Sequence, residues 1–128
     1  MLEKLTNNYR VYSEDVDHMG IVYHANHLRF FERARTEYLR SKGHNLGSLA
    51  LQGTHFAIHH VSLQYHAPGR LDDELFIDTT CELKRAMTLE FKQLMTNQNK
   101  TVICEATFQV VCLNDKLKPK RIDKTLFG

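Results

Sequence analysis

Side chains that could carry out chemistry are concentrated in one short stretch near the start of the chain. They are Asp15, Asp17, His18, His24, Asn26 and His27. The stretch lies directly before a segment that we expect to be helical, where free backbone N–H groups and the helix dipole favour negative charge. Asp17 could attack an acyl carbon or activate water there, with helix N–H groups stabilising the oxyanion. The structural alternative is that Asp17 caps the turn and Asp15 is a solvated loop residue.

The histidines do not indicate a metal site. Only His24 and His27 have helical i,i+3 spacing, and neither an HExxH nor a paired-cysteine pattern accompanies them. His55 and His59 would stand roughly 13 Å apart on one strand face, which is too far for a single ion. We interpret them as polar-face residues and expect neither a metal nor a cofactor.

Other enzyme classes are excluded by missing motifs. The sequence has no GxSxG elbow, no GxGxxG and no phosphate-binding GxxxxGK[ST]. Cys81, Cys104 and Cys112 alternate with apolar residues on expected strand faces, which favours buried thiols. The charge-rich stretch at residues 32–37, in which Arg33 and Glu37 stand four residues apart, indicates a solvated helix face.

Composition indicates one ordinary globular domain over residues 1–128. The formal net charge is only +2, which argues against a dedicated nucleic-acid binder. The sequence contains no run of about 20 apolar residues, so it predicts no transmembrane segment. The N-terminus also lacks the apolar core of a signal peptide, so we expect a cytoplasmic protein.

Hydrophobic periodicity predicts the elements that position these side chains. A short strand is expected at residues 9–12, followed by one long helix at 26–42 and a helical turn within 45–53. Period-two alternation then predicts four strands, at residues 61–67, 75–83, 89–95 and 102–112. Short connections favour antiparallel pairing, and only the long helix can cover the apolar face. The expected fold class is α+β, with a five-stranded antiparallel sheet wrapped around one central helix.

Residues 10–26, RVYSEDVDHMGIVYHAN, resemble the signature of the hotdog-fold acyl-CoA thioesterases. More narrowly, they resemble the 4-hydroxybenzoyl-CoA thioesterase group and its YbgC-like branch. Residues 28–37, 68–73 and 110–112 extend the resemblance over nearly the whole chain. The resemblance implies hydrolysis of acyl-CoA to free acid and CoA.

The resemblance also assigns roles within this motif. Asp17 corresponds to the catalytic aspartate, as nucleophile or general base, and His24 to a second catalytic position. The oxyanion donor would be a backbone N–H at or beside His24, and Tyr23 and Asn26 would contact substrate. Val16, His18-Met19 and His27, where a Tyr is usual, depart from the family pattern and bear on the shape of the acyl pocket.

The resemblance further implies a subsite for the CoA head group and an oligomer. Lys84 and Arg85, at the turn between the third and fourth strands, would bind phosphate, although a charged, solvated hairpin tip is the alternative. Edge-to-edge dimerisation is implied, often doubled to a homotetramer, with active sites at the subunit boundary. Two other functions remain open: a hotdog dehydratase, and a non-catalytic module that binds acyl-CoA or acyl-carrier protein. Acyl-carrier protein is also an alternative thioester donor.

Overall fold

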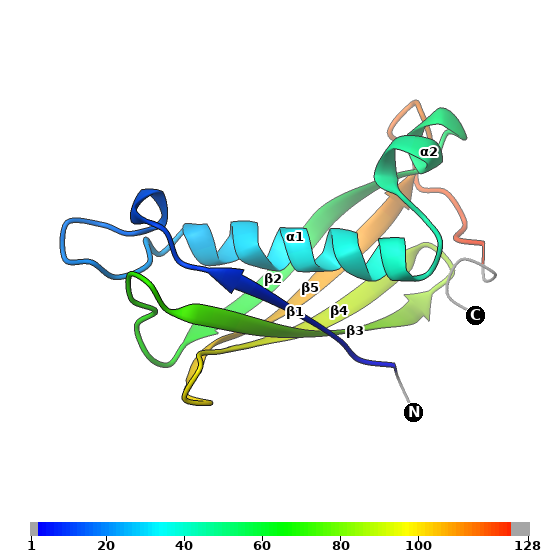
Figure 1. Cartoon of the computed structure of the whole chain (residues 1–128). Helices are drawn as coiled ribbons and strands as arrows, with labels where there is room; N and C mark the ends of the chain where they lie inside the picture. The colour runs from blue at the N-terminus through cyan, green and yellow to red at the C-terminus, as the bar shows by residue number, and fades with distance from the viewer. Residues whose placement is uncertain (1–2, 124–128) are drawn as a thin grey trace.

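The structure, a computed structural model, describes residues 3–123. In chain order the elements are β1 (Leu5–Arg10), the short 3₁₀ turn η1 (Ser13–Asp15), α1 (Asn26–Ser41), α2 (Leu46–Leu51), β2 (His55–Tyr65), β3 (Glu74–Arg85), β4 (Thr88–Thr96) and β5 (Val102–Leu113). All strand pairs are antiparallel, in the order β1-β3-β4-β5-β2. Figure 1 shows α1 lying across one face of this sheet. The predicted α+β architecture is confirmed.

The long helix forms nearly where its periodicity predicts, and it ends before Gly43, whose φ of +86° suits a residue without a side chain. The inner face of α1 buries aromatic side chains against the sheet. The ring of Phe31 packs edge-on against Phe108 at 5.8 Å, and Tyr38 packs against Phe91 at 6.0 Å. Leu28, although apolar, is 40% exposed on the first turn of α1.

Arg35 corrects the prediction that the charged part of the helix is simply solvated. Its side chain is buried, its Nη1 donates to Gln93 Oε1 at 3.1 Å, and its guanidinium lies 4.0 Å above the Phe108 ring centroid. Gln93 Nε2 in turn donates to the Phe31 carbonyl and to Thr79 Oγ1, both at 3.0 Å. Burial lowers the pKa of Arg35 to about 10. These hydrogen bonds join α1 to β3 and β4 inside the core.

Strand β2 begins six residues earlier than its alternation predicts, at His55 rather than at Val61. The cause is a β-bulge. Ile58 lies opposite Val110 and His60 lies opposite Gln109, so His59 is an extra residue without an opposite partner on β5. The bulge shifts the apolar positions by one, which hides the first half of the strand from a period-two search. It also contradicts the assumption that His55 and His59 share one face of a regular strand.

The two edges of the sheet are β1 and β2. Strand β2 exposes several large side chains, namely Ile58, Val61 and Tyr65, which are 40–53% accessible. An edge strand with unpaired backbone groups and exposed apolar side chains is a template for pairing with another chain. Within residues 3–123, no helix is long and apolar enough to cross a membrane.

Candidate active site

The loop between β1 and α1 folds back on itself and presents Asp17. Val16 and Val22 form an antiparallel bridge, and the Asp17 N–H donates to the Ile21 carbonyl at 2.9 Å. Gly20 closes the turn by donating to the Asp17 carbonyl at 3.0 Å, with a φ of +76° that favours glycine. The Gly in the motif is therefore needed for the tight turn that holds Asp17.

The two oxygens of the Asp17 carboxylate have different surroundings. Oδ1 accepts the Met19 N–H at 2.8 Å and the Ile21 N–H at 3.4 Å. No N–H or O–H group of residues 3–123 donates to Oδ2. The two hydrogen bonds to Oδ1 orient the carboxylate. Because the side chain is only half-buried, Oδ2 is available to a substrate or water.

Asp15 is buried, so the alternative that it is a solvated loop residue is wrong. Its Oδ2 accepts the Tyr12 N–H and its Oδ1 accepts the Asn26 side-chain amide, both at 2.8 Å. Its carbonyl accepts the Tyr23 N–H at 3.0 Å. Asp15 therefore ties the loop to the first residue of α1, and Asn26, which we expected to contact substrate, donates its amide to this carboxylate.

The start of α1 carries no side-chain cap. Ala25 occupies the N-cap position, where Ser, Thr, Asp or Asn would normally accept a helix N–H. Among the described residues, the His24 N–H has no hydrogen-bond acceptor, and His24 is exposed. Its ring packs on the exposed Tyr23 ring at 4.4 Å. Within the same residues no hydrogen bond joins this ring to Asp17.

Sequence reasoning missed Tyr65 as a neighbour of this loop. Its hydroxyl donates to the His24 carbonyl, although 41 residues separate the two in sequence. The only signal in the sequence was its apolar position in the expected strand, which says nothing about its hydroxyl. The antiparallel pairing of β2 with β5 carries the end of β2 to the entry of α1.

Lys84 and Arg85 lie far from Asp17 within one chain. The Val11 N–H donates to the Asp73 carbonyl, so the Asp17 loop lies at the Glu74 end of β3. Ten residue steps then separate Glu74 from Lys84, roughly 33 Å of strand. The two basic residues line a pocket of about 290 Å³ together with His59. Lys84 pairs with Glu82 at 3.3 Å and Glu90 at 3.5 Å, and its hydrogen bond to Glu82 contributes most to raising its pKa.

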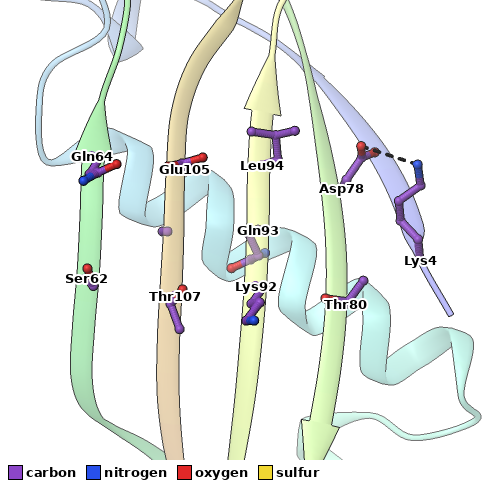
Figure 2. A pocket seen from close by; sticks show the side chains of 11 residues that line it. Lys4, Ser62, Gln64, Asp78, Thr80, Lys92, Gln93, Leu94, Glu105 and Thr107 are labelled. Atoms are coloured by element: carbon purple, nitrogen blue, oxygen red, sulfur yellow. Dashed lines mark ion pairs between the residues drawn. The ribbon is translucent and has the colours of Figure 1, made fainter. Parts of the chain in front are cut away.

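A wider hollow of about 600 Å³ lies on the sheet face opposite α1, but it contains none of the predicted site residues. Figure 2 shows its polar lining and the ion pair between Lys4 and Asp78, which are 3.7 Å apart. In residues 3–123 no three His, Cys, Asp or Glu side chains gather as metal ligands would. The loop before α1 therefore remains the candidate active site.

Comparison with known proteins identifies the family of this chain. The family model of the thioesterase superfamily matches residues 19–104. The chain belongs to the thioesterase superfamily. Relatives within it include the acyl-CoA thioester hydrolase YbgC of Escherichia coli O6:H1, which is 40% identical over 91% of this chain and 88% of its own. The acyl-CoA thioesterase YbgC of Haemophilus influenzae is 38% identical over 90% of this chain and 85% of its own.

Among solved structures, a probable thioesterase from Bartonella henselae has a TM-score of 0.87 and 29% identity, and the alignment covers 96% of this chain and all of that one. The hotdog fold implied by the sequence resemblance is thereby confirmed. The superfamily match begins two residues after Asp17, so the role of that carboxylate is inferred from the geometry of the loop and from the sequence motif.

Proposed function

We propose that this thioesterase-superfamily chain hydrolyses acyl-CoA thioesters to a free acid and CoA at the loop before α1. The observation that carries the proposal is the arrangement at this loop. A carboxylate with one oxygen anchored and the other available lies near a helix start without a capping side chain. The family membership and the names of the YbgC relatives support the choice of a thioester as substrate.

In the proposed mechanism, Asp17 acts in one of two ways. It either attacks the thioester carbon and expels CoA thiolate, forming a mixed anhydride that water then hydrolyses to the free acid and the Asp17 carboxylate, or it removes a proton from the water that attacks the thioester carbon and displaces CoA thiolate. The His24 N–H then stabilises the negative charge that develops on the carbonyl oxygen. One such donor typically contributes 10²–10³-fold to kcat. A thiol with a pKa of about 8.5 leaves as thiolate without a strong acid, so no second catalytic acid is needed. Tyr23, beside His24 and exposed, would contact the bound substrate.

The active site is proposed to be complete only in a dimer. A head-group subsite at Lys84 and Arg85 lies roughly 33 Å along β3 from the Asp17 loop of the same chain, but antiparallel pairing of two β2 edges would bring opposite ends of two chains together. The exposed side chains of Ile58 and Val61 on this edge support such pairing. A dimer of dimers and a cytoplasmic location remain predictions from the sequence.

A thiol-release assay with a panel of aliphatic and aromatic acyl-CoAs tests the proposed function. Wild type should release CoA, and Asp17→Ala should lower the rate by about 100-fold or more while remaining folded. Binding of acyl-CoA without release of thiol would indicate the non-catalytic module. Dehydration of a 3-hydroxyacyl thioester without hydrolysis would indicate the dehydratase. Faster release from acyl-carrier protein than from CoA would change the assigned donor.

A further inference from the structure

The carbonyl of His24 accepts hydrogen bonds from two side chains on different elements. The Tyr65 hydroxyl reaches it from the last residue of β2, and Nδ1 of His27 lies 3.2 Å from it on the first turn of α1. The two rings are themselves in contact, edge to face at 4.9 Å. Two side-chain hydrogen bonds restrict the orientation of this carbonyl more than hydrogen bonds to water would.

The backbone on the other side of His24 is also held. The Asn26 N–H donates to the Tyr23 carbonyl at 2.8 Å, which fixes the peptide plane that carries the His24 N–H. The Tyr23 N–H is bound to the Asp15 carbonyl. The two peptide planes that meet at the His24 Cα are therefore both constrained, while the His24 N–H itself has no acceptor within the described part of the chain.

The buried ring of His27 can play this role only with a proton on Nδ1. A carbonyl can only accept, so Nδ1 must carry the proton and donate. In the neutral form Nε2 is then an acceptor, and it is buried without a partner in residues 3–123. Burial also lowers the pKa of His27, which favours this neutral form.

We propose that Tyr65, assisted by His27, is a positioning residue that orients the backbone around the oxyanion donor. This inference rests on the proposed function, because it gives the His24 N–H its catalytic task. An oxyanion donor contributes to catalysis only when it is held in place before the reaction, and small displacements of catalytic groups cost large factors in rate. Tyr65 makes this contact from the edge strand β2. The orientation of the His24 N–H therefore depends on a residue that lies 41 positions later in the sequence.

The test removes one hydroxyl at a time. Tyr65→Phe should lower kcat by about 10-fold to 100-fold with little change in KM, because the lost contact acts on the transition state. Tyr38→Phe is the matched control, since its hydroxyl lies in the core against the backbone of Cys81 and far from the loop. That variant should lose stability but keep the wild-type kcat.

A second measurement reports the contact without substrate. The ¹³C resonance of the His24 carbonyl should shift in Tyr65→Phe and stay in place in Tyr38→Phe. A wild-type kcat in Tyr65→Phe, or a raised KM with unchanged kcat, would overturn the positioning role and leave the proposed function intact. A wild type that releases no thiol from any acyl-CoA would overturn the proposed function and this role together, even if the carbonyl resonance shifts.

Discussion

At the scale of single residues, the two aspartates of the loop before α1 have opposite surroundings. Asp15 is buried and its two oxygens accept two donors, whereas Asp17 is half-buried with one oxygen unbound by residues 3–123. The same side-chain type therefore has a structural task at one position and is available for chemistry at the other. Sequence alone, which shows only their spacing of two, does not reveal this difference in burial.

Exchanging each carboxylate for an amide should separate the two tasks. Asp17→Asn should lower kcat by about 100-fold or more, with a melting temperature close to that of wild type. Asp15→Asn should lower the melting temperature, because it weakens two hydrogen bonds to a buried carboxylate, and should retain more turnover than Asp17→Asn. Thiol release and thermal unfolding of both variants check this. A larger loss of kcat in Asp15→Asn would assign the chemistry to Asp15.

His27 should make the stability of the protein depend on pH. Burial lowers its pKa, so below the ordinary value of about 6.5 the unfolded chain binds more protons than the folded one. The contribution of His27 to the free energy of unfolding is then complete above about pH 6.5. As the pH falls below that value, the free energy of unfolding decreases by at most about 1.4 kcal/mol per pH unit for one group. Urea unfolding between pH 5 and 8 should show a shallower dependence in His27→Phe. The exposed His59, changed to Gln, is the control that should keep the wild-type slope.

At the scale of the elements, α1 is attached to the sheet by polar as well as apolar contacts. Arg35 and Gln93 form the polar part. Within the described residues no carboxylate forms an ion pair with Arg35, although the negative charge of Glu32 opposes the lowering of its pKa by burial. Breaking a buried polar pair leaves an unsatisfied group that costs about 1–3 kcal/mol, whereas replacing both partners by apolar groups can be close to neutral.

A double-mutant cycle tests this coupling. Gln93→Leu and Arg35→Met should each lower the free energy of unfolding, and the double variant should lose less than the sum of the two. Urea unfolding of the four proteins provides the comparison. Additive losses would mean that the guanidinium is stabilised by the Phe108 ring alone.

How far the sequence predicted these elements depended on local regularity. The helix follows from an unbroken run of helix formers that ends at Gly43, and β3 to β5 follow from clean alternation. The first half of β2 was missed because the bulge at His59 breaks the alternation. The motif located Asp17 and His24, but the contact from Tyr65 depends on long-range strand pairing, which no local pattern encodes.

At the scale of the whole molecule, the proposed site residues divide into two groups at opposite ends of β3. The Asp17 loop lies beside Glu74, and Lys84 and Arg85 lie at the other end, roughly 33 Å away. If both groups serve one substrate, they must come from different chains, since a rigid strand separates them within one. The arrangement therefore predicts that two chains with different defects can together form one site that carries neither defect.

Mixing two defective variants tests this sharing. One carries Asp17→Asn, and the other carries Lys84→Ala with Arg85→Ala, which should raise KM several-fold with kcat nearly unchanged. In a mixed dimer with shared sites, one site carries both defects and the other carries none, so low-KM turnover should reappear after the chains are unfolded and refolded together. If each site is built from one chain, every site in the mixture keeps a defect and the low-KM turnover stays absent. Light scattering on the same samples must show a dimer or larger assembly, because a stable monomer would contradict the shared site directly.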